Sequence, residues 1–106
     1  MAEKTIMLVC AAGMSTSLLV SKMQKAAEAQ GLDAEIFAVS AQEADDNLKK
    51  KNIDALLLGP QVKFMEKQFQ GKLAGSSTKL GVINMQDYGM MNGEKVLKYA
   101  QDLMSK

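Results

Sequence analysis

The chain has 106 residues, and its thirteen lysines nearly balance twelve acidic residues. It contains no arginine, no histidine and a single cysteine, Cys10. This composition excludes Cys–His proteases, carriers phosphorylated on histidine, a credible zinc site and a disulfide within the monomer. We therefore expect one domain, residues 1–106, in a reduced cytoplasmic compartment and without a metal or other cofactor.

Charge and hydropathy also narrow the range of partners. The lysines are scattered and aromatic residues are few, which argues against nucleic acid. The one basic run, Lys49-Lys50-Lys51, is better explained as a helix C-terminus. No apolar stretch has the length needed to cross a bilayer, and the first apolar run begins almost at once after residues 1–4. We expect a protein that is not exported, does not itself span a membrane and is monomeric in isolation.

Short apolar runs alternate with amphipathic stretches, which is typical of a parallel sheet wrapped by helices. The predicted strands, in chain order, are residues 5–9, 34–39, 55–58 and 80–83. The predicted helices are residues 15–30, 40–51, 62–73 and a last helix from 92 nearly to the C-terminus. Ser40 and Glu43 have the spacing of a capping box, whereas residues 75–78 and 84–88 are predicted loops.

Right-handed crossovers between these strands give an open four-stranded parallel α/β sheet with helices on both faces. The most economical strand order is 2-1-3-4, which places a switch point between the first and third strands. Ligands of such sheets bind outside the carboxyl ends of the strands. Residues 10–17 and 59–61 should therefore face each other across one crevice, with residues 84–88 beside them.

The first side of this crevice is a candidate phosphate loop like that of a thiol phosphatase. Small residues after Cys10 let backbone N–H groups turn inward, and hydroxyl side chains suit the N-cap of the next helix. Such a helix start stabilises a phosphate or a thiolate and lowers the pKa of a thiol. A lone cysteine more often only packs, but this position favours chemistry on phosphorus. The candidate phosphate-binding residues are Ala11, Ala12, Gly13, Met14, Ser15, Thr16 and Ser17.

Other phosphate-binding α/β classes fit less well. A thiol phosphatase clamps the phosphoryl group with arginine six residues after cysteine, where this chain has Thr16. A receiver domain needs acidic residues after its first and third strands, but Cys10 and Gly59 stand there. A flavodoxin would need aromatic residues around the flavin, and Tyr88 is the one plausible stacker.

Three motifs resemble those of a known family: Cys10-Ala11-Ala12-Gly13-Met14-Ser15-Thr16-Ser17-Leu18-Leu19, Gly59-Pro60-Gln61-Val62 and Tyr88-Gly89. They are similar to the enzyme IIB component of the lactose/cellobiose (chitobiose) family of the bacterial sugar phosphotransferase system. The similarity runs almost end to end, and its first motif is the most specific. Ala11 replaces the serine of the commoner spelling, which removes a hydroxyl but no backbone donor.

The resemblance implies a phosphocysteine carrier. Cys10 would accept a phosphoryl group from phosphohistidine of enzyme IIA and pass it to a cellobiose- or lactose-type β-disaccharide that enters through membrane enzyme IIC. The lack of an arginine clamp suits an intermediate that must wait for its acceptor. The second wall of the crevice would be Gly59, Pro60, Gln61 and Tyr88.

The sequence leaves two points open, the role of the exposed methionines and the alternative functions. Most of the nine methionines are expected to fill the core, whereas Met14, Met90 and Met91 are expected to be exposed around the crevice and are candidates for a docking face. The alternative function is a non-catalytic α/β module that binds phosphate or a nucleotide and in which Cys10 is incidental. A phosphatase is a weaker third alternative.

Overall fold

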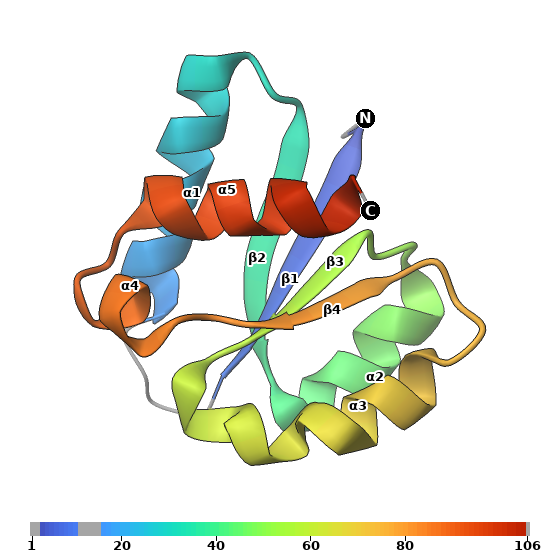
Figure 1. The fold of residues 1–106 in the computed structure, drawn as a ribbon. Helices are drawn as coiled ribbons and strands as arrows, with labels where there is room; N and C mark the ends of the chain where they lie inside the picture. The colour runs from blue at the N-terminus through green and yellow to red at the C-terminus, as the bar shows by residue number, and fades with distance from the viewer. Residues whose placement is uncertain (1–2, 11–15, 106) are drawn as a thin grey trace.

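The structure, a computed structural model, describes residues 3–10 and 16–105. Its centre is a four-stranded parallel β-sheet with helices packed against both faces (Figure 1). The spatial order of the strands is β2-β1-β3-β4, so the predicted fold class, strand order and switch point are confirmed. The strands are β1 (Lys4–Cys10), β2 (Ala34–Ser40), β3 (Ala55–Leu58) and β4 (Lys79–Val82).

The helices divide between the two faces of the sheet (Figure 1). Helices α1, α4 and α5 pack on one face, and α2, η1 and α3 pack on the other. Within the part of the chain that the structure describes, no helix has both the length and the apolar character needed to cross a bilayer. The helical segments are α1 (Thr16–Gln30), α2 (Ala41–Lys50), the 3-10 helix η1 (Pro60–Met65), α3 (Glu66–Leu73), α4 (Met85–Gly89) and α5 (Gly93–Met104).

Two predicted segments differ from the structure, one a helix and the other a loop. The single helix predicted over residues 62–73 begins earlier, as the 3-10 helix η1, and Val62 has the non-helical angles φ −116° and ψ 21°. Proline favours this early start because its fixed φ suits the first helical position, where no N–H is required. The loop predicted over residues 84–88 contains α4, because the Asn84 side chain accepts hydrogen bonds from the backbone N–H groups of Gln86 and Asp87.

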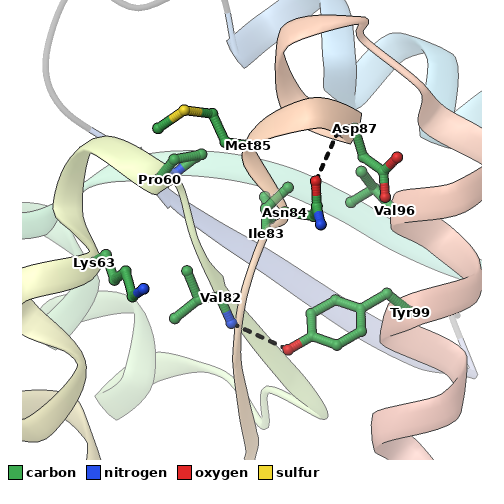
Figure 2. A pocket seen from close by; sticks show the side chains of 9 residues that line it. All are labelled: Pro60, Lys63, Val82, Ile83, Asn84, Met85, Asp87, Val96 and Tyr99. Atoms are coloured by element: carbon green, nitrogen blue, oxygen red, sulfur yellow. Dashed lines mark hydrogen bonds between the residues drawn. The ribbon is translucent and has the colours of Figure 1, made fainter.

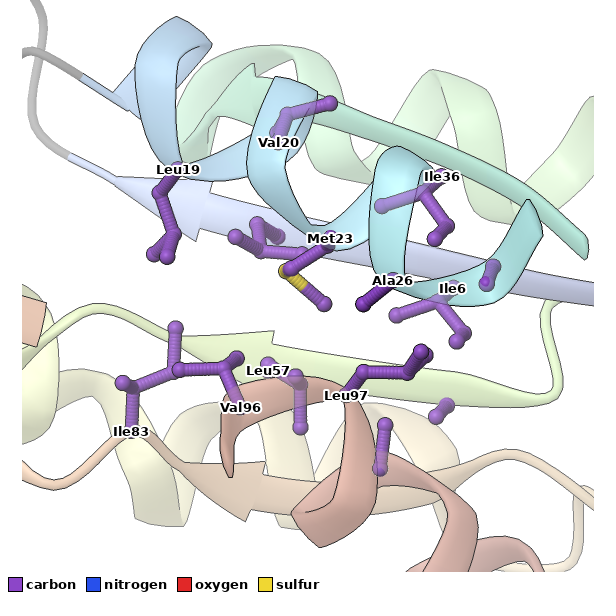
Figure 3. Packing of buried hydrophobic residues seen from close by; sticks show 14 of the residues in the cluster. Ile6, Leu19, Val20, Met23, Ala26, Ile36, Leu57, Ile83, Val96 and Leu97 are labelled. Atoms are coloured by element: carbon purple, nitrogen blue, oxygen red, sulfur yellow. The ribbon is translucent and has the colours of Figure 1, made fainter. Parts of the chain in front are cut away.

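Strand β1 supplies both hydrophobic cores, because successive side chains of a strand point to opposite faces. Ile6, Leu8 and Cys10 belong to the cluster with α1 and α5 (Figure 3), whereas Met7 and Val9 belong to the cluster with α2 and α3. All four residues of β3 are fully buried, as predicted for an apolar central strand. The alternation therefore directs the Cys10 side chain toward the face that α1 covers.

The predicted capping box at the start of α2 is present. The Ser40 hydroxyl accepts a hydrogen bond from the Glu43 N–H at 3.4 Å, and the Ser40 N–H donates to Glu43 Oε1 at 3.2 Å. We expect Ser40→Ala to lower the free energy of unfolding by about 1 kcal/mol, because the Glu43 N–H loses the hydroxyl that accepts its hydrogen bond. Urea unfolding measures the change, with Ser77→Ala in an exposed loop as the control. Equal unfolding midpoints for the two variants would contradict this prediction.

Candidate functional site

Cys10 is the last residue of β1 and lies at the carboxyl edge of the sheet. Its side chain is 3% exposed and packs in the cluster that α1 and α5 cover. Thr16 and Ser17 lie in the first turn of α1, which begins one residue after the predicted helix start at residue 15. The other predicted phosphate-binding residues, 11–15, lie outside the described residues, so the phosphate loop stays a prediction.

The segment after β3 reaches Cys10, as the strand order predicts. The Gly59 N–H donates a hydrogen bond to the Val9 carbonyl oxygen at 2.8 Å. A Cβ atom on Gly59 would lie 3.0 Å from Cys10 Sγ and 3.2 Å from Gln61 Oε1. The structure thus brings together Cys10, Gly59 and Gln61, with the Gly59 backbone against the sulfur atom.

Pro60, the residue after Gly59, lines a pocket of about 590 Å³ (Figure 2). Lys63 of η1 lines one wall, and Asn84, Asp87 and Tyr99 line the other. The Tyr99 hydroxyl lies against β4, where it accepts a hydrogen bond from the Val82 N–H at 3.2 Å. The pocket lies outside the carboxyl ends of β3 and β4, and both polar and apolar side chains line it.

Tyr88 is placed differently from the other predicted crevice residues. It is only 5% exposed and belongs to the same core cluster as Cys10, on the α1 and α5 face. A buried ring offers no face for stacking on a flavin, so the structure gives no support to the flavodoxin alternative. Tyr88 therefore contributes to this site by packing, as part of the core behind the cysteine.

Several large apolar side chains are exposed in the segments that follow strands β1, β3 and β4. Phe64 of η1 is 82% exposed, and Leu18, Met85 and Met90 are also exposed. Exposed apolar side chains in these segments are candidates for contact with a partner. Met90 is exposed as predicted, and Met14 lies outside the described residues.

The exposure predicted for Met91 is wrong. Its side chain is half-buried against the α1 and α5 core, and its backbone has a φ of 53°. Sequence reasoning also missed Phe64 and Met85 as exposed apolar residues. The available signal was that Phe64 falls off the helical stripe of Val62, Met65 and Phe69 and so cannot share their buried side.

Comparisons with known proteins identify the family. The model for "PTS system, Lactose/Cellobiose specific IIB subunit" matches residues 5–99. The chain is 55% identical to the galactose-specific EIIB component of Lactococcus lactis subsp. cremoris (strain MG1363), over 99% of this chain and 100% of that protein. It is 42% identical to the oligo-beta-mannoside-specific EIIB component of Bacillus subtilis (strain 168), over 95% of this chain and 96% of that one.

Solved structures agree with the fold. The solution structure of a cellobiose-specific IIB component from Borrelia burgdorferi has a TM-score of 0.76 and 36% identity, over 96% of this chain and 92% of that chain. A lactose-specific IIB domain from Streptococcus pneumoniae has a TM-score of 0.83 at 14% identity, over 95% of this chain and 97% of that one, and supports the fold alone. The sequence resemblance is thereby confirmed, and the chain belongs to the lactose/cellobiose-specific IIB subunits of the sugar phosphotransferase system.

Proposed function

We propose that Cys10 is the residue that carries the phosphoryl group in this IIB subunit. IIB subunits of this family transfer a phosphoryl group to a sugar during its uptake, and this chain has that activity. The observation that supports the role of Cys10 is the position of its Sγ at the switch point of the sheet, beside Gly59 and just before α1. A strand end followed by a helix start is where α/β proteins bind phosphate.

The proposed reaction has two displacements at phosphorus. In the first, the S–P bond forms as the P–N bond of phosphohistidine on enzyme IIA breaks, and the thiol proton passes to the departing imidazole. In the second, a sugar hydroxyl forms an O–P bond as the S–P bond breaks, and the hydroxyl proton returns to the sulfur. Backbone N–H groups of residues 11–17 would bind the phosphoryl oxygens in both steps.

The composition of the chain favours a long-lived intermediate. The sequence contains no arginine to stabilise charge during hydrolysis and no histidine to activate water. These features suit a carrier that waits for its acceptor, and they do not suit a phosphatase.

The partners and location follow from this chemistry. We infer that enzyme IIA is the donor and that membrane enzyme IIC presents the sugar, because the chain is a IIB subunit of the sugar phosphotransferase system. A thiol that must remain reduced favours the cytoplasm. We also infer that residues 1–106 act as one IIB domain, because both core clusters share one sheet.

A cellobiose- or lactose-type β-disaccharide is the proposed substrate. The chain is 55% identical both to the galactose-specific component named above and to a cellobiose-specific EIIB component of Lactococcus lactis subsp. lactis (strain IL1403). Equal similarity to two components named for different sugars favours selection of the sugar by enzyme IIC.

Reconstitution tests the function. The chain is combined with phosphoenolpyruvate, the general phosphotransferase proteins, the matching IIA and membranes that contain IIC. We expect phosphorylated cellobiose or lactose, no phosphorylation of maltose, and no product when IIA is omitted. The chain alone should not hydrolyse an aryl phosphate at a measurable rate. Turnover of an aryl phosphate at ordinary phosphatase rates would contradict the carrier function.

A further inference from the structure

The end of the Gln61 side chain and the Cys10 thiol both lie close to Gly59. Gln61 Oε1 and Cys10 Sγ lie 3.2 and 3.0 Å from the same point, the position that a Cβ atom of Gly59 would occupy. The carboxamide and the sulfur atom therefore border one small space beside Gly59. Cys10 is buried, whereas Gln61 as a residue is exposed to solvent.

The backbone around Gly59 maintains this arrangement. The Gly59 N–H donates to the Val9 carbonyl oxygen at 2.8 Å, and the Val62 N–H donates to the Gly59 carbonyl oxygen at 3.0 Å. Pro60 fixes its own φ at the start of η1. These constraints orient the turn and set the direction in which the Gln61 side chain leaves the backbone.

Glycine at position 59 leaves space beside the sulfur atom, and its backbone conformation does not need glycine. Its angles, φ −64° and ψ 155°, are available to any residue. A side chain there would enter the gap between the sulfur atom and the carboxamide. Gly59 thus keeps open the space into which a group bound to the sulfur would extend.

We propose that the Gln61 carboxamide donates a hydrogen bond to the phosphoryl group on Cys10, which makes Gln61 a further residue of the transfer site. This inference rests on the proposed role of Cys10. A carboxamide has an oxygen acceptor and an NH₂ donor that exchange places when the terminal group rotates. The oxygen can therefore face the thiol, and Nε2 can face a phosphoryl oxygen after transfer.

This donor fits the requirements of a carrier. As the S–P bond forms and the P–N bond of the donor phosphohistidine breaks, negative charge is redistributed over the phosphoryl oxygens. A neutral N–H donor stabilises this charge, while Gln61 itself gains and loses no proton. Because an amide is not a base, it does not activate water against the phosphocysteine.

The test is single-turnover phosphorylation of the chain by phosphorylated IIA. We expect Gln61→Ala to slow phosphoryl transfer roughly 10- to 100-fold, the effect of losing one hydrogen bond to a charged group. Gln61→Glu should slow it further, because glutamate has the same shape but brings a negative charge and no donor. Gln68→Glu, which makes the same change at an exposed position of α3, should transfer at the wild-type rate.

A spectroscopic measurement separates phosphate binding from partner docking. In the isolated phosphorylated chain, the Nε2–H resonances of Gln61 should move downfield relative to the unphosphorylated chain, while those of Gln68 stay in place. Transfer at the wild-type rate in Gln61→Ala, or unchanged Gln61 resonances, would overturn this inference and leave Cys10 as the carrier. Failure of wild-type Cys10 to become phosphorylated would instead overturn the proposed function.

Discussion

Replacing Cys10 with serine is expected to abolish phosphoryl transfer to sugar, with a loss of about 10³-fold or more. A serine hydroxyl stays protonated near neutral pH, and the chain has no histidine to remove its proton. Cysteine at the end of β1 supplies a nucleophile that ionises far more readily at the same position. The measurement is the rate of sugar-phosphate formation in the reconstituted system.

Two controls make this result interpretable. Because serine is slightly smaller than cysteine, the buried site can accommodate it, and circular dichroism should show the wild-type fold. Ser77→Ala removes a hydroxyl from an exposed loop before β4, at the edge of the sheet opposite to Cys10, and should keep wild-type activity. Substantial transfer by a folded Cys10→Ser variant would contradict the assignment of Cys10.

Replacing Gly93 with alanine is expected to destabilise the fold by about 3 kcal/mol. Gly93 begins α5 where that helix meets α1, and an added Cβ would lie 2.6 Å from the Lys22 carbonyl carbon and 2.7 Å from the Met23 nitrogen. Backbone atoms cannot rotate out of the way as side chains can, so the two helices must separate. That separation would disturb the core around Met23, Val96 and Leu97 (Figure 3).

Gly71→Ala is the matched control for this prediction. Gly71 lies in α3, and a Cβ atom there would meet nothing within 4 Å. Alanine should raise the free energy of unfolding by about 0.5 kcal/mol, because it loses less backbone entropy in a helix than glycine. Urea unfolding of both variants measures the difference. The account of the α1–α5 contact fails if Gly93→Ala is as stable as the wild-type protein.

The sequence was sufficient to predict the sheet because its strands have strong local signals. The wholly apolar Leu56-Leu57-Leu58 indicates a strand that is buried on both faces, and handed crossovers restrict the strand order. The capping box at Ser40 was predictable because it depends on residues close in sequence. The same topology predicted that Gly59 would lie opposite Cys10.

Features that depend on tertiary contacts were not predictable in the same way. Helix α4 is a short segment without apolar periodicity; its local signal is the Asn84 cap, but the burial of Tyr88 depends on the folded chain. Met91 has a backbone φ of 53°, which methionine rarely adopts, and its side chain is partly buried against the core. The direction of the Gln61 side chain depends on the turn at Pro60, so its proximity to the sulfur was visible only in three dimensions.

The arrangement around Cys10 accounts for two requirements of a carrier. In the proposed carrier, Cys10 is buried at the end of β1, while the exposed apolar side chains of Leu18, Phe64, Met85 and Met90 lie in segments that follow strands β1, β3 and β4. These four residues are candidates for contact with both successive partners. Methionine side chains repack easily, so one surface can adapt to two partners.

The most direct test is the intact mass of the wild-type chain after incubation with phosphoenolpyruvate, the general phosphotransferase proteins and the matching IIA. The phosphocysteine account predicts a gain of one phosphoryl group, located on the peptide that contains Cys10, and its loss when IIC membranes and sugar are added. A phosphoryl group found on serine, threonine or lysine, or no gain of mass with an active IIA, would contradict the account.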